Sequence, residues 1–357
     1  MKRITVKVGS NVLTRPDGTL DVTRMSALVD QIAQLRHEGV EVILVSSGAV
    51  ASGRSEIKPS SRHLDTTSQR QLFSAVGQAK LINRYYELFR DHGIAVGQVL
   101  TMKENFATRR HYLNQKNCMT VMLENDVIPI VNENDTISVT ELMFTDNDEL
   151  SGLIASMMDA DALIILSNID GIYNGSPSDP SSQVIREIGQ QMDLSDYIQT
   201  SKSSFGRGGM LTKTNIARKV ADEGIEVIIA NGKKDDILLH LMHDADTVST
   251  RFTPNPQGIS GVKKWIAHSE GFAKGEIALN AQAVEALRGE KAVSVLPVGI
   301  IRVEGEFEKD DIIRIVDVEG EPIGVGKANC TSAQVSATMG KHGNRPVVHY
   351  DYLYLES

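Results

Sequence analysis

Two lysines in the sequence are placed where a cation could meet a phosphate group. Lys7 lies inside the first predicted strand, two residues before Gly9, and Lys213 lies at the start of a predicted helix. Burying an ammonium group without a partner is costly, whereas beside a phosphate it supplies a point charge in a fixed position. A lysine on an edge strand that points to solvent is the alternative interpretation of Lys7.

The stretch before Lys213 is rich in glycine. Residues 205–213 contain Gly206, Gly208 and Gly209, followed by Thr212 and the lysine. Such a loop lets backbone N–H groups wrap phosphate oxygens at a helix N-terminus while the lysine reaches the transferring group. Because its order and spacing differ from the G-x-x-x-x-G-K-[ST] phosphate loop, an ordinary flexible loop stays open as the alternative.

A turn of small residues follows the predicted strand at 42–45. It consists of Ser46, Ser47, Gly48 and Ala49. Small side chains and a glycine at a strand-to-helix turn let backbone N–H groups approach an anion. Ordinary tight turns have the same composition, so the turn alone does not decide between the two interpretations.

Two clusters of amide and carboxylate side chains complete the candidate chemistry. The first comprises Asn132, Glu133, Asn134 and Asp135, and the second comprises Thr145, Asp146, Asn147 and Asp148. Together they could hold an ammonium group and orient lysines, and a hairpin-like segment at 139–144 separates them. Solvated loop tips are the alternative, and neither cluster has the histidine or cysteine spacing of a zinc site.

The elements that must position these residues alternate between strand and helix from residue 4 to about 240. Apolar runs predict strands at 4–8, 42–45, 94–100, 127–131, 162–166 and 227–230, and helical periods occur near 25–35, 69–90, 108–125 and 215–222. This pattern predicts an α/β fold, with an open, mainly parallel sheet sandwiched by helices. The four candidate segments then lie beyond the carboxyl ends of strands, where such sheets bind their ligands.

The pattern changes after about residue 245. Residues 253–258 have turn chemistry, and β-like pieces follow at 292–296, 312–316 and 347–355, with one helical stretch at 281–287. A second, small and mostly β domain of about 80 residues fits this segment.

Composition limits the classes of function. The 357 residues carry a net charge of −9, which offers no general attraction to nucleic acid or anionic lipid. Cys118 and Cys330 form no disulfide or metal pattern, the N-terminus reads as a strand instead of a signal peptide, and no apolar run approaches membrane-spanning length. We therefore expect a cytoplasmic protein.

In this order and spacing, the segments resemble the amino acid kinase family over nearly the whole chain. The runs 132–135 and 208–213 are the most specific, and 170–173 adds a further match. From about Gly275 the chain resembles a PUA domain, a pairing typical of members that phosphorylate glutamate. The resemblance implies an amino acid kinase domain over 1–265 and a PUA domain over 275–357.

The resemblance also implies a reaction, namely ATP-dependent phosphorylation of the γ-carboxylate of L-glutamate to L-glutamyl 5-phosphate, the first step of proline biosynthesis. The implied catalytic residues are Lys7 and Lys213, which would contact the ATP phosphates, and Asp148, which would position their ammonium groups. The implied glutamate-binding residues are Ser47, Asp135 and Asn147, with Asn132 nearby. The implied ATP-binding residues are Lys7, Ser167, Asn168, Arg207, Gly208, Gly209, Met210, Leu211, Thr212 and Lys213.

Further expectations concern the cofactor and partners. Mg²⁺ would be carried on the ATP phosphates, without metal ligands assigned in the chain, and the resemblance implies proline as a feedback inhibitor and a homo-oligomer. Asn168 stands where the family usually has an acid, and Arg207 and Leu211 stand where smaller or hydroxyl residues are usual. These departures bear on nucleotide affinity and not on the type of reaction.

Three other functions compete with this expectation. Another kinase of the same fold would use a different acceptor. An RNA-binding protein is the second, because PUA domains elsewhere bind RNA, but residues 275–357 hold 8 Lys and Arg against 13 Asp and Glu. A catalytically dead scaffold is disfavoured by the presence of both lysines and Asp148.

Overall fold

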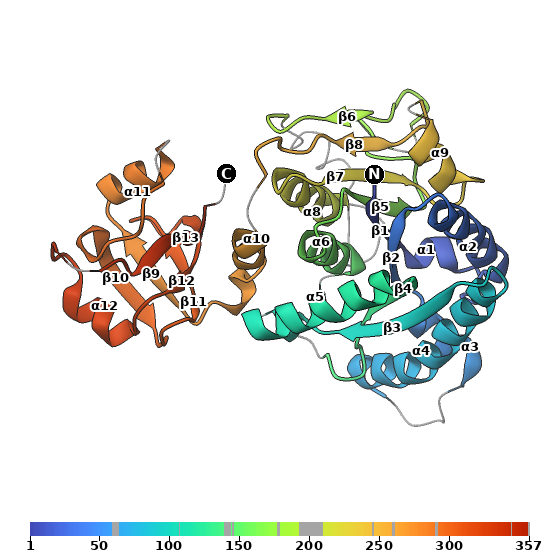
Figure 1. Cartoon of the computed structure of the whole chain (residues 1–357), viewed down its shortest axis with the longest axis horizontal. Helices are drawn as coiled ribbons and strands as arrows, with labels where there is room; N and C mark the ends of the chain where they lie inside the picture. The colour runs from blue at the N-terminus through green and yellow to red at the C-terminus, as the bar shows by residue number, and fades with distance from the viewer. Residues whose placement is uncertain are drawn as a thin grey trace. The chain divides into compact units, whose positions relative to one another are not determined.

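The computed structural model describes most of the chain as two compact units (Figure 1). The described residues are 1–58, 64–106, 108–138, 144, 146–176, 179–192, 210–244, 246–258, 261–289, 292–343 and 345–355. The larger unit comprises Met1–Asn105 and Leu113–Gly258, and the smaller comprises Phe106–Tyr112 and Ile259–Ser357.

An eight-stranded sheet forms the centre of the larger unit, in the order β3-β4-β2-β1-β5-β7-β8-β6. The strands are β1 Arg3–Val8, β2 Glu41–Ser46, β3 Ala95–Thr101, β4 Val127–Glu133, β5 Ala162–Ser167, β6 Glu187–Ile188, β7 Glu226–Asn231 and β8 Thr250–Phe252. All neighbouring pairs are parallel except β7 with β8. The predicted mainly parallel α/β fold is confirmed.

The position of β1 decides one open question. β1 pairs with β2 on one side and β5 on the other, so it is an interior strand. Lys7 is only 5% exposed. The interpretation of Lys7 as a solvent-facing residue of an edge strand is therefore wrong.

Helices surround the sheet. They are α1 Ser10–Leu13, α2 Val22–His37, α3 Ala49–Glu56, α4 Thr66–Arg90, η1 Lys103–Phe106, α5 Arg109–Glu124, α6 Asn147–Met157, α8 Met210–Asp222 and α9 Ile237–His243. Aspartate side chains cap three of them: Asp21 accepts from the N–H of Arg24, Asp65 from that of Ser68, and Asp146 from two N–H groups of α6. Each cap satisfies backbone donors that have no partner within the helix.

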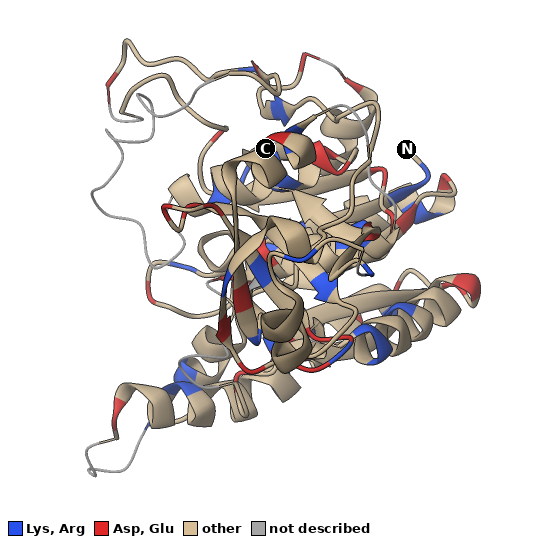
Figure 2. Cartoon of the chain, turned by 90° about the vertical axis from the view of Figure 1, so that its left-hand side faces the viewer, with Lys and Arg blue, Asp and Glu red and all other residues tan. Residues whose placement is uncertain are grey.

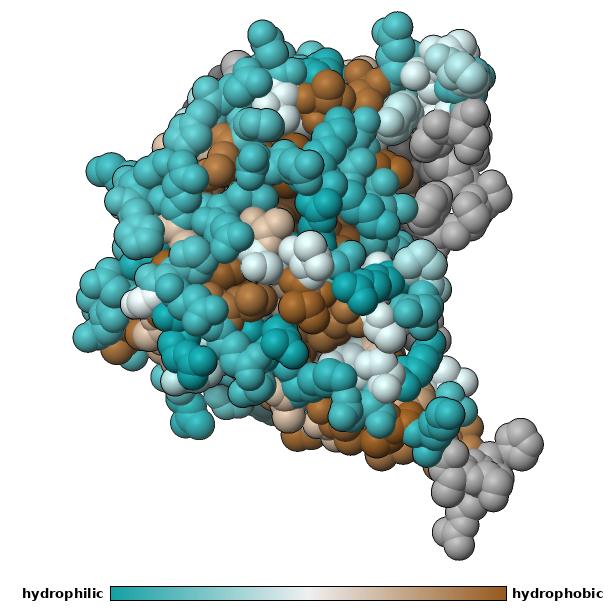
Figure 3. Space-filling model, turned by 90° about the vertical axis from the view of Figure 1, so that its right-hand side faces the viewer, coloured by the Kyte–Doolittle hydropathy of each residue, from teal (hydrophilic) through white to brown (hydrophobic). Residues whose placement is uncertain are grey.

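Alternation along the strands separates two cores. Val6 and Ile164 pack in one core with residues of α2, α4 and α9, whereas Leu163 and Ile165 pack in another with residues of α6 and α8. Successive strand residues point to opposite faces, so the odd-numbered positions of β5 face α6 and α8. The face in Figure 3 is mostly hydrophilic, with apolar residues exposed only in small groups.

The smaller unit contains a five-stranded sheet in the order β10-β9-β11-β12-β13. Its elements are α10 Gly261–Ala267, η4 Glu270–Phe272, β9 Gly275–Leu279, α11 Ala281–Arg288, η5 Pro297–Gly299, β10 Ile300–Gly305, β11 Ile312–Val316, β12 Pro322–Ala328, α12 Ser332–Thr338 and β13 Val348–Leu355. The neighbouring pairs are antiparallel except β9 with β11. The expected mostly β character of this segment is confirmed.

One predicted strand of the smaller unit is wrong. At 292–296 only Val295 forms a β-bridge, to Val348, and the chain then enters η5 at Pro297. Proline cannot donate to a ladder, so the bridge is not extended into a strand. No helix in the described parts of the chain is long and apolar enough to cross a membrane.

Two glycines let α3 and α4 pack against each other at very short distance. A Cβ built on Gly77 would lie 1.8 Å from the carbonyl oxygen of Ala49, and one on Gly53 would lie 1.8 Å from that of Phe73. Because both obstructing atoms are backbone, they cannot move aside as a flexible side chain can. This close contact fixes the position of α4. Polar side chains of α4 contact residues at the carboxyl ends of β2 and β4.

We predict that Gly77→Ala destabilises the chain. Helix propensity alone would favour alanine by about 1 kcal/mol, but the backbone clash reverses the sign and costs at least about 2 kcal/mol. Urea unfolding followed by circular dichroism measures the difference. Gly189→Ala is the control for a glycine outside any helix, because no atom of the described residues lies within 4 Å of its Cβ position. Equal stability of the two variants would contradict the prediction.

Candidate functional site

A buried carboxylate joins the two lysines singled out in the sequence. Asp148 Oδ1 lies 2.6 Å from Lys7 Nζ, and Asp148 Oδ2 lies 2.5 Å from Lys213 Nζ. The Asp148 side chain is fully buried, and those of Lys7 and Lys213 are 7% and 13% exposed. Residues from three distant parts of the chain thus form one ion-paired group, which we call the lysine–aspartate triad.

Local structure explains why these three side chains meet. Lys7 pairs with Ile165 of β5 and so points to the face of the sheet that α6 and α8 cover. Asp148 and Lys213 lie in the first turns of those two helices. At Gly152 a Cβ would lie 2.9 Å from Ile216, so the glycine lets α6 and α8 approach closely. A Cβ built on Gly9 would be in ordinary van der Waals contact with Lys7 Nζ, at 3.5 Å.

Opposing influences set the pKa values of the two neighbouring aspartates. Burial alone would raise the pKa of Asp148, but the ammonium groups of Lys7 and Lys213 outweigh it and hold that pKa below its ordinary value. Burial, followed by the nearby Asp148 carboxylate, raises the pKa of Asp146. Asp146 Oδ1 caps α6, whereas its buried Oδ2 has no hydrogen-bond partner among the residues that the structure describes. The triad is therefore anionic at its centre and cationic at both ends.

A hydrogen-bonded network of amides and a hydroxyl lies next to Asp148 in the chain. Asn147 Nδ2 donates to Ser47 Oγ at 2.8 Å and to Asn132 Oδ1 at 3.1 Å. It also lies 3.4 Å from the carbonyl oxygen of Ser46. The structure thus brings together Ser47, Asn147 and Asn132, which belong to three separate segments of the sequence.

Asp135 is placed differently. It follows β4 and is buried, but its partners come from α4: Arg70 Nε and Nη2 lie 2.9 and 2.5 Å from Asp135 Oδ1, and Ser74 Oγ donates to Oδ2 at 3.2 Å. Further along α4, Gln78 Oε1 accepts from Asn132 Nδ2 at 3.0 Å. Asp135 is therefore linked to the amide network through α4.

The row of polar residues on α4 is not among the site residues predicted from the sequence. Arg70, Ser74 and Gln78 recur every four residues, which places them on one face of the helix. Polar residues at that spacing were the available signal, but the same pattern also describes an ordinary solvated face. Only the location of the helix beside β4 distinguishes the two.

Glu133, the last residue of β4, also contacts Arg70 and so belongs to the same polar cluster as Asp135. Its carboxylate accepts from Ser138 Oγ at 2.9 Å, from the Phe144 N–H at 3.0 Å and from Arg70 Nη2 at 3.1 Å. Burial is the main cause that raises the pKa of Glu133, and the neighbouring Asp135 adds to it. Glu133 and Asp135 therefore share one guanidinium.

The predicted nucleotide-binding residues are described in part. Ser167 ends β5, is 9% exposed, and has its Oγ 3.4 Å from Asn168 Oδ1. Met210, Leu211 and Thr212 form the first turn of α8, which begins five residues earlier than the helix predicted at 215. Arg207, Gly208 and Gly209 lie outside the described residues, as do residues 139–143 of the hairpin-like segment.

No cluster of three or more histidine, cysteine, aspartate or glutamate side chains that could hold a metal ion is present among the residues that the structure describes. Asp146 Oδ2 is buried and has no hydrogen-bond partner in the described part of the chain, and a carboxylate oxygen is the kind of hard ligand that Mg²⁺ accepts as one of its few protein ligands.

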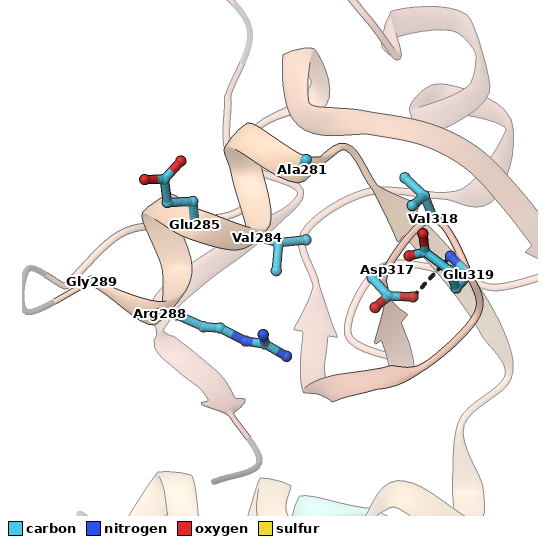
Figure 4. Close-up of a pocket in the computed structure, with 8 residues that line it drawn as sticks. All are labelled: Ala281, Val284, Glu285, Arg288, Gly289, Asp317, Val318 and Glu319. Atoms are coloured by element: carbon cyan, nitrogen blue, oxygen red, sulfur yellow. Dashed lines mark hydrogen bonds between the residues drawn. The ribbon is translucent and has the colours of Figure 1, made fainter.

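A separate cavity of about 610 Å³ lies in the smaller unit (Figure 4). It is lined by Ala281, Val284, Glu285, Arg288, Gly289, Asp317, Val318 and Glu319. Three of these side chains are acidic and one is basic, a balance unsuited to a polyanion such as RNA. Figure 2 shows Lys and Arg scattered among Asp and Glu along the described parts of the chain.

Comparison with known proteins gives two family matches. Residues 2–231 match the amino acid kinase family, and residues 275–350 match the PUA domain. A protein of Bacteroides thetaiotaomicron named glutamate 5-kinase is 78% identical over 99% of this chain and 98% of its own length. Proteins with the same name from Chlorobaculum tepidum and Trichlorobacter lovleyi are 48% and 37% identical, each over 99% of this chain and 97% of their own.

The triad predicts a pH-dependent contribution to stability. The pKa of Asp148 is lower in the folded chain, so Asp148 stabilises the fold above the unfolded value of about 3.9, and this contribution is lost as the pH falls through the folded value. Asp148→Asn leaves two ammonium groups without their anion, at a cost of about 3–5 kcal/mol near pH 7.

Urea unfolding at a series of pH values measures this effect. The difference between the unaltered chain and Asp148→Asn is expected to be constant above about pH 5 and to shrink below about pH 4. Asp126→Asn serves as the control, because the Asp126 side chain is 91% exposed. A difference that does not depend on pH would contradict the assignment.

Proposed function

The chain belongs to the amino acid kinase family, and we propose that it transfers the γ-phosphoryl group of ATP to the γ-carboxylate of L-glutamate, giving L-glutamyl 5-phosphate. The observation that supports this best is the buried Asp148 shared by Lys7 and Lys213, adjacent in the chain to the Ser47–Asn147 pair. We assign the kinase domain to residues 1–265 and the PUA domain to 275–357.

The chemistry of the acceptor explains why no general base is needed. A γ-carboxylate has a pKa near 4.3, so at pH 7 it is already ionised and nucleophilic. The barrier comes instead from repulsion between this anion and the anionic γ-phosphoryl group, and from the need for in-line positioning. Fixed cations are therefore the main catalytic requirement.

Lys7 and Lys213 supply these cations. Both are nearly buried, so their charges act in a medium of low dielectric and are held in place before the substrates arrive. Asp148 is the residue that holds them, one carboxylate oxygen to each ammonium. In this proposal the lysines contact the phosphates of ATP while Asp148 keeps their spacing.

Mg²⁺ fits the site as an ion carried mainly by the ATP phosphates. Asp146 would contact it, since its buried Oδ2 has no hydrogen-bond partner among the described residues and a single carboxylate with phosphates and waters is a usual Mg²⁺ ligand set. When bound, the ion would neutralise charge on the β- and γ-phosphates. Asp146 itself caps α6 and so orients the first turn that carries Asp148.

We assign glutamate binding to Ser47, Asn147 and Asp135. The Ser47 hydroxyl and the Asn147 amide lie together and can hydrogen-bond a carboxylate, whereas the Asp135 carboxylate suits the α-ammonium group. We assign the nucleotide to Ser167, Asn168 and residues 207–213. The departures at Asn168, Arg207 and Leu211 would adjust nucleotide affinity.

We infer three further properties by the same resemblance. The product would feed proline biosynthesis, proline would inhibit the enzyme by feedback, and the chain would form a homo-oligomer.

The acceptor specificity is tested by trapping the acyl phosphate with hydroxylamine. We expect hydroxamate formation with L-glutamate and ATP, and at least ~10²-fold lower kcat/KM with N-acetylglutamate, which lacks the ammonium that Asp135 would pair with. L-aspartate, one methylene shorter, is the second comparison. Activity restricted to an acceptor other than glutamate would refute the proposed function.

The lysine assignment predicts the effect of two substitutions. Lys7→Ala and Lys213→Ala are each expected to lower kcat by at least ~10², as removal of a preorganised charge often does. Steady-state kinetics with glutamate and ATP measures this. Lys116→Ala is the control, because Lys116 forms a surface pair with Asp159. Near-normal turnover in either triad variant would rule out its assigned role.

A further inference from the structure

The polar row on α4 contains a cation at its N-terminal end. Arg70 is held against Asp135 by two contacts, of 2.9 and 2.5 Å, and against Glu133 by one of 3.1 Å. Among the described residues, it is the cation that forms ion pairs with both carboxylates. One guanidinium therefore lies beside two anions at the end of β4.

Burial within this group is uneven. The side chains of Glu133 and Asp135 are 4% and 8% exposed, whereas that of Arg70 is 31% exposed. Of the three side chains, that of Arg70 is therefore the most accessible to solvent. A ligand that reaches Asp135 lies next to Arg70, because the two side chains are in contact.

The charges of this group match a free α-amino acid. At pH 7 such a molecule carries an ammonium and a carboxylate on the same carbon. A site that accepts both needs an anion and a cation in contact, and Asp135 with Arg70 provides that pair. Arginine suits a carboxylate because its planar guanidinium can bind both oxygens.

We propose that Arg70 is a specificity-determining residue that binds the α-carboxylate of the amino acid substrate, beside the α-ammonium on Asp135. This inference rests on the proposed function and extends it, because the site residues assigned above contain no cation for the α-carboxylate. Ser74 and Gln78, one and two turns along α4, orient Asp135 and Asn132 by hydrogen bonds.

A purely structural role for Arg70 is the competing explanation, since the guanidinium also holds Asp135 in place. The two roles differ in what they do to a substrate without the α-carboxylate charge. L-Isoglutamine, the α-amide of glutamate, keeps the α-ammonium and the reactive γ-carboxylate. Misplacement of Asp135 would weaken both compounds equally, whereas loss of a carboxylate contact weakens glutamate alone.

The experiment compares kcat/KM for L-glutamate and L-isoglutamine by hydroxylamine trapping. In the unaltered chain kcat/KM is expected to be much higher for glutamate than for isoglutamine. Arg70→Gln is expected to reduce the ratio of the two values at least ~10-fold, mainly by lowering kcat/KM for glutamate. An unchanged ratio in Arg70→Gln would overturn the proposal and leave Arg70 a structural role.

Two control variants accompany the measurement. Arg84→Gln is the matched substitution on the same helix, where Arg84 pairs with Glu87 and is 40% exposed, and it should leave both compounds unaffected. Asp135→Asn should weaken both compounds and leave their ratio unchanged, because both carry the α-ammonium.

A second variant and a binding measurement keep the test decisive. If Arg70→Gln does not fold or turn over, Arg70→Lys keeps the charge without the planar fork, and calorimetric titration with the two compounds should give a smaller but measurable fall in preference. An unchanged preference there also overturns the proposal. Absence of glutamate phosphorylation by the unaltered chain would instead refute the proposed function itself.

Discussion

One buried carboxylate determines the arrangement of the site. Asp148 has no contact with solvent, so its charge is tolerable only because Lys7 and Lys213 each pair with one of its oxygens. The two ammonium groups in turn tolerate their proximity and burial because of the anion between them. This mutual dependence ties β1, α6 and α8 to one another, and it holds two cations where an incoming polyphosphate would meet them without reorganisation.

The remainder of the site is built around α4. Gly53 and Gly77 let α3 and α4 approach to backbone contact, and this contact fixes the row of polar side chains along the ends of β2 and β4. At the far end of the row, the Tyr85 hydroxyl lies 2.8 Å from Ser46 Oγ, and burial raises the pKa of Tyr85 to about 12. The polar side chains of α4 therefore run from the ion pair of Arg70 with Asp135 to the neutral, buried hydrogen bond of Tyr85 with Ser46, next to Ser47.

The local hydrophobic pattern predicted a strand correctly where burial alone determines it. It failed where glycine or proline also affects the pairing. The interior strands β2, β5 and β7 have continuous apolar runs, and such runs predict strands that are buried on both faces. β12 was not predicted, since Gly324 and Gly326 weaken its strand character, yet the close approach of Tyr354 and Val348 requires them. The predicted strand at 292–296 failed because Pro297 ends the pairing after a single bridge.

The sequence by itself determined the parallel α/β class, the order of the elements and the four segments that carry charge and amides, because hydrophobic period and turn chemistry are local properties. Tertiary structure alone decided that Lys7 is interior and that Arg70 belongs beside Asp135. It also supplied the geometry by which Asp148 pairs with two lysines 206 positions apart in the chain, a role that the family resemblance had implied. Such pairings depend on which strands are neighbours and which helices share a face. Those are long-range relations that no window of sequence contains.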